Sequence, residues 1–101
     1  MAALDLLGRR WVLRILWELL PSPAGFRELQ ARCGAMSASV LDTRLRDLRS
    51  AALAETAADG KWRLTPLGQD LNAALAGLHN WSARWARELR RAPARSAVAG
   101  R

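Results

Sequence analysis

Residues 26–53 read FRELQARCGAMSASVLDTRLRDLRSAAL, and this stretch decides the fold of the chain. It predicts a short amphipathic helix, a tight turn and a second, longer helix. Gly34 suits the turn, and Ser37 is placed to cap the start of the second helix. Two helices in this order predict a helix-turn-helix, in which the second helix is held out to enter the major groove of DNA.

The side chains of the second helix divide into an apolar stripe and a polar face. At about 100° per residue the stripe, which must be buried, consists of Leu41, Leu45, Leu48 and Ala52. The opposite face consists of Ser39, Asp42, Thr43, Arg46 and Ser50. The Arg46 guanidinium suits a guanine edge or a phosphate. The alternative is that Asp42 and Arg46 form an ordinary surface ion pair, which contributes roughly 0.3 kcal/mol.

The composition indicates one small domain. The chain has 101 residues and a formal net charge of +7, and arginine supplies all but one of its 16 basic side chains. Residues 1–80 carry ten basic and eight acidic side chains, net +2, whereas residues 81–101 carry six arginines and one glutamate, net +5. The predicted helix-turn-helix is therefore only mildly basic, so the overall charge by itself is weak support for DNA binding.

Several classes of site are not expected. The single cysteine, Cys33, rules out an intrachain disulfide and a multi-cysteine metal site, and it fits a small buried hydrophobic side chain. The lone histidine, His79, has no second ligand candidate nearby. No stretch approaches the ~20 apolar residues of a membrane span. The chain also lacks a set of nucleophile, base and orienting group. We therefore expect a soluble, cytoplasmic protein that is not an enzyme and has no cofactor or metal.

The segment from Leu4 to Leu20 predicts one helix that is apolar around nearly its whole circumference. A helix this apolar is buried on more than one side, so we expect one side to face a second copy of the protein. Its only polar stripe consists of Arg10, Arg14 and Glu18. The residues expected on the core side are Leu4, Trp11 and Ile15, and a separate flank consists of Leu6, Leu13, Trp17 and Leu20.

The segment from Leu53 to Leu64 predicts a β-hairpin with a glycine-permitted turn. Trp62 and Leu64 are expected to face inward, which leaves Lys61 and Arg63 facing outward. Two cations on a hairpin beside a recognition helix can neutralise phosphates that flank the groove, as a DNA-binding wing does. A solvated hairpin with incidental charges is the alternative.

A long helix is predicted after the hairpin, with Thr65 as its cap and Pro66 at its first position. Its apolar stripe consists of Leu67, Leu71, Ala74, Leu75, Leu78, Ser82, Trp85 and Leu89. A helix of about 27 residues is about 40 Å long, which exceeds what one small domain covers and implies a second subunit. Residues 1–92 are thus expected to form a winged domain with its dimerisation helices, and residues 93–101 a disordered basic tail.

The order of these elements resembles the winged helix-turn-helix regulators. More narrowly, the segments ALDLLGRRWVLRILWELL, GFRELQ, MSASVLDTRLRDLRSAAL and WRLTPLGQDL resemble the HxlR-type regulators of the MarR-like group, from about Ala3 to Trp85. The resemblance implies a mainly α fold with a small β-hairpin, and a homodimer joined through the first and last helices. Its two recognition helices would meet half-sites about one DNA turn apart. The DNA-binding residues that it implies are Ser37, Ser39, Asp42, Thr43, Arg44 and Arg46 on the recognition helix, and Lys61 and Arg63 on the wing.

The leading hypothesis is a homodimeric, sequence-specific transcriptional regulator, a repressor, that binds double-stranded DNA. A second, compatible hypothesis is the binding or sequestration of a planar aromatic ligand, which as an effector would shift DNA affinity. It depends on Trp17, Trp81 and Trp85, on helices expected to meet at the dimer junction, where indole rings can sandwich a flat molecule. Simple packing is the alternative role for these tryptophans. A winged helix used only for protein contacts is a third hypothesis.

Overall fold

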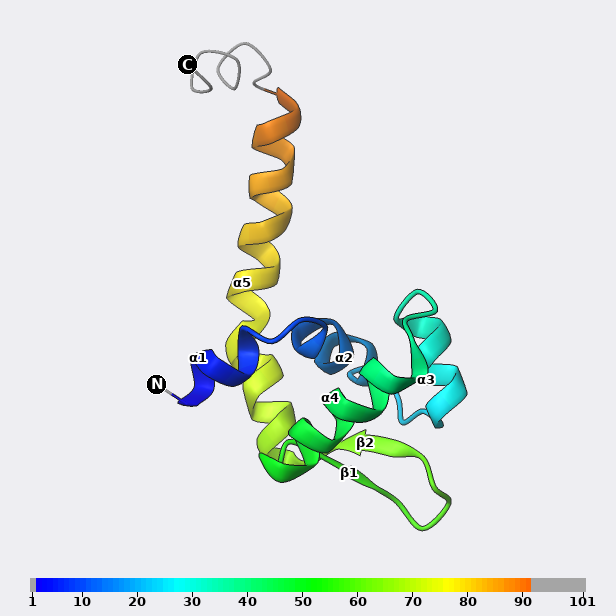
Figure 1. Cartoon of the computed structure of the whole chain (residues 1–101). Helices are drawn as coiled ribbons and strands as arrows, with labels where there is room; N and C mark the ends of the chain where they lie inside the picture. Colours follow the sequence, from blue (N-terminus) through cyan, green and yellow to red (C-terminus); the bar gives the residue numbers. More distant parts are fainter. Residues whose placement is uncertain (1, 92–101) are drawn as a thin grey trace.

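The computed structural model describes residues 2–91, which form five helices and one two-stranded antiparallel hairpin (Figure 1). The elements are α1 (Ala2–Leu7), α2 (Val12–Leu19), α3 (Phe26–Arg32), α4 (Ala38–Ser50), β1 (Ala54–Thr56), β2 (Trp62–Leu64) and α5 (Pro66–Arg91). The predicted mainly α fold with a small hairpin, a winged helix-turn-helix with a long last helix, is confirmed. The predicted basic tail, residues 93–101, lies outside the described residues.

The turn between α3 and α4 is built by backbone conformation and two side-chain hydrogen bonds. Gly34 has a φ of +78°, a left-handed conformation that glycine adopts without a steric cost. The Gln30 side-chain amide donates to the Met36 carbonyl at 2.8 Å and thereby closes the turn. The Ser37 hydroxyl accepts a hydrogen bond from the Val40 amide at 3.2 Å, so Ser37 caps α4 as predicted.

The apolar stripe of α4 is buried at three of its four predicted positions. Leu41, Leu45 and Leu48 are at most 1% exposed and belong to the main core, together with residues of α2 and α3. Ala52 was expected in the same stripe, and this prediction is wrong. Since α4 ends at Ser50, Ala52 lies beyond the helix, with a φ of +61° and an exposed side chain.

The first predicted helix is two helices, so the prediction of one continuous helix from Leu4 to Leu20 is wrong. The chain breaks between α1 and α2, and Trp11 there has a φ of +78°. Contacts from α4 stabilise the break, because the Arg44 guanidinium donates to the Arg10 carbonyl at 2.9 Å. Leu4 consequently does not join Ile15 in the core and is 65% exposed, whereas Trp11 is half-buried against the core.

The hairpin has the predicted orientation of its side chains. Leu64 is buried and Trp62 half-buried, while Lys61 and Arg63 are exposed. The Trp62 backbone also exchanges two hydrogen bonds with Ala24, of 2.7 and 3.0 Å. This bridge fixes the start of β2, next to the hairpin turn, to the loop between α2 and α3.

Helix α5 starts against the core and then leaves it, as Figure 1 shows. The Thr65 hydroxyl accepts from the Gly68 amide at 3.0 Å, which confirms the predicted cap, and donates to the Ala52 carbonyl at 2.6 Å. A Cβ atom at Gly68 would lie only 2.1 Å from the Leu53 carbonyl oxygen, so glycine is required for this close approach. The Asn72 side-chain amide donates to the Leu16 carbonyl at 2.9 Å and joins α5 to α2.

Candidate nucleic-acid interface

The outward face of α4 is polar, and every residue predicted on it is exposed. Thr43 donates to the Ser39 carbonyl at 2.9 Å, and the Ser37 and Ser39 hydroxyl oxygens lie 3.5 Å apart. Arg46 forms an ion pair with Asp42 at 2.9 Å, with the two side chains 75% and 51% exposed. Because an exposed pair of this kind contributes at most about 1 kcal/mol, Arg46 can exchange Asp42 for a base edge or phosphate at low cost.

Arg44 is on the same helix but turns toward the protein. Its side chain is 24% exposed, and it contacts the Arg10 carbonyl and the Asp47 carboxylate, the latter at 2.9 Å. The Asp47 carboxylate also forms an ion pair with the Arg9 guanidinium, at 3.0 Å. Arg44 therefore holds α4 against the junction of α1 and α2, and the structure does not bring it to the exposed polar face. Its predicted contact with DNA stays a prediction, as do those of the other site residues.

The Asp47 carboxylate is the centre of this group of charges. Partial burial by itself raises the pKa of Asp47, but the hydrogen bonds from Arg44 and Arg9 outweigh burial and hold the pKa below its ordinary value of 3.8. Asp47 is thus ionised throughout the physiological range. The group joins α4 to the junction of α1 and α2.

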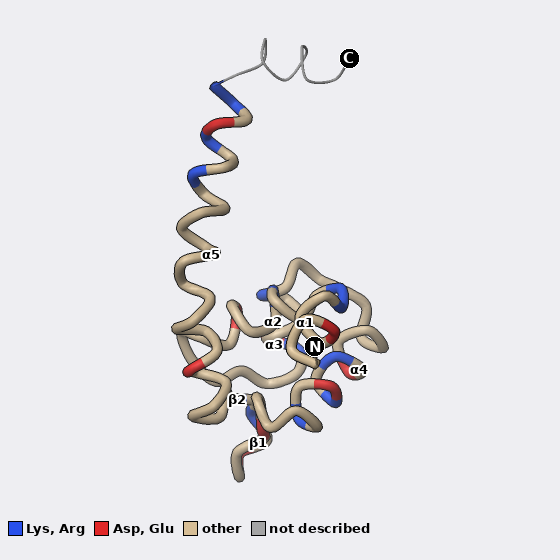
Figure 2. The backbone as a smooth tube through the Cα atoms, turned by 90° about the vertical axis from the view of Figure 1, so that its left-hand side faces the viewer, with Lys and Arg blue, Asp and Glu red and all other residues tan. Residues whose placement is uncertain are grey.

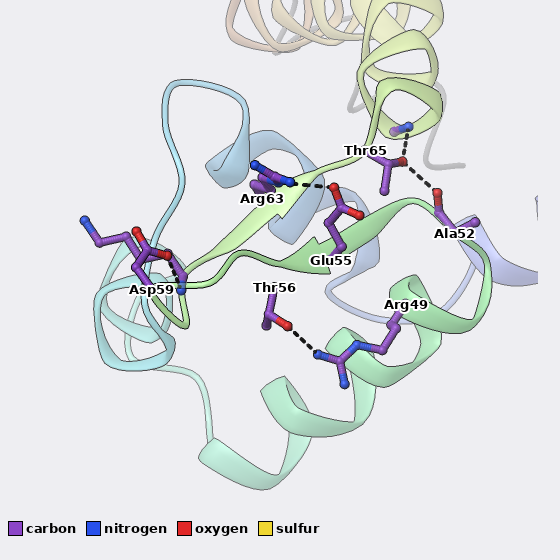
Figure 3. A network of polar contacts seen from close by, with 9 residues as sticks. Arg49, Ala52, Glu55, Thr56, Asp59, Arg63 and Thr65 are labelled. Carbon is purple, nitrogen blue, oxygen red and sulfur yellow. Dashed lines mark hydrogen bonds and ion pairs between the residues drawn. The ribbon is translucent and has the colours of Figure 1, made fainter.

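The wing carries its two predicted cations at different places. Lys61 lies beside the hairpin turn, which the Asp59 carboxylate stabilises by accepting from the Lys61 amide at 3.0 Å. Arg63 lies opposite Glu55 in the ladder and pairs with its carboxylate at 3.1 Å, as Figure 3 shows. Lys61 forms no ion pair with any of residues 2–91, so of the two cations it is the more available to a phosphate.

Arg49 joins the recognition helix to the wing, and the sequence reasoning missed it. Its guanidinium donates to the Thr56 hydroxyl at 3.2 Å (Figure 3) and lies 4.5 Å from the centre of the Trp62 ring. A cation over an indole face is a favourable arrangement. The contacts of Arg49 with Thr56 and Trp62 depend on the register of the two strands, and the periodicity of α4 gives no information about that register. The presence of an arginine in the last turn of α4 was the one local signal.

The three tryptophans predicted to bind a ligand do not form one cluster within a single copy. Trp81 and Trp85 stack on α5, with ring centres 5.4 Å apart and planes inclined by 20°. Trp17 instead contacts His79, with ring centres 4.0 Å apart. All three indoles are between 45% and 53% exposed. The stacked pair on α5 is therefore the larger aromatic surface.

Other classes of site receive no support from residues 2–91. They contain no group of three or more metal-ligating side chains, and none of their helices is long and apolar enough to cross a membrane. Cys33 is 1% exposed, and burial raises its thiol pKa, with the Glu18 carboxylate adding to the effect. The predicted role of Cys33 as a small buried side chain is confirmed, since a reactive thiolate needs the opposite conditions.

A capped, outward-facing polar helix beside a cationic hairpin defines a winged helix-turn-helix DNA-binding transcription regulator. The sequence pattern of the HxlR-like helix-turn-helix family matches residues 6–90. The chain belongs to that family.

Three relatives support this assignment. The HTH-type transcriptional regulator YvaP of Bacillus subtilis is 30% identical in an alignment of 89 residues that covers 82% of this chain and 82% of that protein. The structure of quinone-bound YodB from B. subtilis is similar with a TM-score of 0.74 and 28% identity, covering 82% of this chain and 92% of that chain. The structure of a MarR-family regulator from Enterococcus faecalis V583 is similar with a TM-score of 0.75 and 26% identity, covering 89% of this chain and 87% of that chain.

Proposed function

We propose that this regulator binds a specific operator in cytoplasmic DNA as a homodimer and represses transcription. The observation that carries the proposal is the exposed polar face of α4 flanked by the wing cations. In each subunit α4 would enter the major groove and present Ser39, Asp42, Thr43 and Arg46 to base edges. Ser37 at the start of α4 and the wing cations Lys61 and Arg63 would bind phosphates, and Arg44 would hold the helix at its angle.

The proposed homodimer is supported by apolar surface that one copy leaves uncovered. On α5, Leu78, Trp81, Trp85 and Leu89 are between 44% and 54% exposed. Apolar surface gathered in this way on one projecting helix is typical of an interface between subunits.

The described elements support repression as the proposed mode of action. Residues 2–91 comprise a DNA-binding domain and one long helix. Occupation of a promoter by such a dimer would block the polymerase, and it would require no further contact surface.

The test is binding of the purified protein to its own upstream intergenic DNA, measured by fluorescence anisotropy across a salt series beside a scrambled duplex of equal length. The proposal expects binding at physiological salt that is at least about 10³-fold tighter for the native duplex. Equal binding to both duplexes with a steep salt dependence would mean that the arginines bind phosphates without reading sequence, and would overturn the proposal.

A second function, recognition of a planar aromatic effector, is favoured by the stacked Trp81 and Trp85. The solved relative YodB was crystallised with a quinone bound, which is a flat molecule. In this chain the effector would lie against the exposed indoles at the dimer junction and alter the spacing of the recognition helices.

Tryptophan fluorescence tests this second function. Titration with a flat quinone or dye should give saturable quenching, and the Trp85→Leu variant should lose most of it, whereas Trp62→Phe on the wing should retain it. Quenching that rises linearly without saturation, or that survives Trp85→Leu unchanged, would exclude a site at the stacked pair.

A further inference from the structure

The turn of the hairpin extends beyond the last pair of its ladder. The ladder begins at a buried pair of residues and ends where Thr56 lies opposite Trp62. Residues 57–61 form the turn, and among the described residues every hydrogen bond of this turn lies within the hairpin itself. The position of the turn, and of Lys61 within it, therefore depends on how the pair of Thr56 and Trp62 is held.

Two contacts from outside the hairpin meet at this last pair. The Trp62 backbone is bonded to Ala24 in both directions, at 2.7 and 3.0 Å. The Arg49 guanidinium donates to the Thr56 hydroxyl at 3.2 Å and lies 4.5 Å from the centre of the Trp62 ring. Side chains that lie opposite each other in an antiparallel ladder share one face of the sheet, so Arg49 contacts both strands at once.

Arg49 differs in its partners from the neighbouring arginines of α4. Figure 2 shows basic and acidic positions interspersed along this helix. Arg46 pairs with Asp42, and Arg44 pairs with Asp47. Arg49 lies in the last turn and forms no ion pair with any of residues 2–91. Within these residues its side-chain partners are a hydroxyl group and an indole ring, and both belong to the wing.

An exposed guanidinium beside the wing has two possible uses. It could leave the wing and bind a DNA phosphate, or it could stay and hold the wing in place. Leaving would cost Arg49 both the hydrogen bond to Thr56 and the contact with the Trp62 ring. Lys61 adjoins Trp62 on the side of the turn, and it has no ion pair within residues 2–91 to give up. The geometry therefore favours Lys61 for the phosphate and Arg49 for holding the wing.

We infer that Arg49 is a positioning residue for DNA binding, which holds the wing against the end of α4 so that Lys61 meets a phosphate without reordering of the hairpin. The inference rests on the proposed function and adds the residue on which its wing contact depends. A wing that is already held has less conformational freedom to lose on binding, and such a loss would weaken the complex. A held wing also fixes the distance between the phosphate contact and α4 in the groove.

The variants Arg49→Ala and Lys61→Ala, alone and together, test whether Arg49 acts through the wing. Their affinity for the upstream intergenic duplex is measured by fluorescence anisotropy across a salt series. Arg49→Ala should raise Kd about tenfold in the wild-type background and at most about twofold in the Lys61→Ala background, because a wing without its cation has no contact to position. The slope of log K against log salt should be the same for Lys61→Ala and for the double variant.

Two other roles of Arg49 predict different results. If Arg49 bound a phosphate itself, the double variant would lose about 0.9 of a further unit of slope for each subunit bound. If Arg49 only stabilised the fold, Arg49→Ala would weaken binding by the same factor in both backgrounds. Either result would overturn the inference.

A partner of Arg49 on the wing gives a second variant that does not change the charge. Thr56→Val removes the hydroxyl group that accepts from Arg49, and valine is well suited to a strand. It should raise Kd about threefold in the wild-type background and leave Kd unchanged in the Lys61→Ala background. Arg87→Ala is the matched control for charge, because it removes an exposed arginine from α5 and should act equally in both backgrounds. An effect of Thr56→Val that persists with Lys61→Ala would contradict the inference.

Hydrogen exchange measures the hold on the wing without DNA. The Ala57 amide donates to the Lys61 carbonyl at 2.9 Å, and the Trp62 amide donates to the Ala24 carbonyl at 2.7 Å. Both amides should exchange about fivefold faster in Arg49→Ala, while the amide of Leu45 in the middle of α4 should keep its rate. Unchanged exchange at the hairpin would overturn the inference and leave the proposed function standing.

The DNA measurements also separate the two proposals. A wild-type protein that binds no duplex overturns both. Equal binding of the native and the scrambled duplex overturns the reading of a specific operator alone. The positioning role of Arg49 then still depends on the comparison between the two backgrounds, since a phosphate contact is present on every duplex.

Discussion

Arg44 and Arg46 are two residues apart on one helix and have opposite surroundings. Arg46 is 75% exposed, whereas Arg44 is held by the Arg10 carbonyl and Asp47. Arg46→Ala should therefore leave the melting temperature nearly unchanged and reduce discrimination between operator and scrambled duplex by about 1–3 kcal/mol. Anisotropy with both duplexes measures this difference. Arg87→Ala removes the same charge from α5 and should preserve discrimination; if the two variants behave alike, Arg46 does not read bases.

For Lys61 we propose a contact with a phosphate rather than with a base. Lys61→Ala should weaken binding to every duplex by the same factor and lower the slope of log K against log salt by about one for each wing bound. Salt titrations on the native and scrambled duplexes give both slopes. A loss of affinity confined to the native duplex would contradict a phosphate contact. Lys61→Arg, which keeps the charge, should keep the slope.

Asp47 gives stability a defined dependence on pH. Its folded-state pKa is lower than 3.8, the ordinary value, so its contribution is complete above that value and is lost as the pH falls through the folded pKa. Asp47→Asn should lower the melting temperature at neutral pH, and the gap from wild type should narrow below pH 3.8. Thermal scans between neutral and acid pH measure the gap. For Asp42→Asn, whose carboxylate is exposed, we expect a small gap at every pH.

At the scale of elements, one glycine controls how α5 meets the hairpin. Gly68→Ala would force a Cβ to within 2.1 Å of the Leu53 carbonyl oxygen, so it should lower the free energy of unfolding by about 3 kcal/mol. Gly77→Ala is the control, because nothing lies within 4 Å of its Cβ position and the substitution favours helix by up to about 1 kcal/mol. Urea unfolding at fixed protein concentration compares them. Equal effects would mean that α5 does not approach Leu53 so closely.

Elements whose causes are local could be predicted from the sequence. Ser37 and Thr65 cap helices with their own hydroxyls, and both predictions are confirmed. The alternation of Trp62, Arg63 and Leu64 was enough to orient the hairpin. Hydrophobic period and capping chemistry act within a few residues, so a single sequence carries their signal.

Features with distant causes could not be predicted. The break before α2 is stabilised by Arg44, which lies 34 positions after Arg10 in the chain. Because the Arg44 side chain turns inward to make this contact, it does not belong to the exposed polar face of α4. The Arg49 contact with Thr56 likewise depends on how α4 meets the hairpin. Periodicity assigns a side chain to a face of its helix, but it does not say which other element will accept a long guanidinium that lies at the border of that face.

At the scale of the whole molecule, the shape is set by one projecting helix. The described residues measure 54 × 27 × 24 Å, and the long dimension follows α5. If a second copy covers α5, the melting temperature should rise with protein concentration, since dissociation accompanies unfolding. Scans over a hundredfold range of concentration test this. A melting temperature that is independent of concentration would indicate a stable monomer.

The hydrogen bond from Arg44 to residue 10 ends on a backbone oxygen. Every amino acid supplies that oxygen, so position 10 can change freely during evolution while the contact persists. Related sequences would then keep the arginine at position 44 while the residue at position 10 varies. No covariation between positions 44 and 10 is therefore expected. The hydrogen bond that Arg44 contributes to this joint is thus inherited through one side chain, and its loss at position 44 has no compensating substitution at position 10.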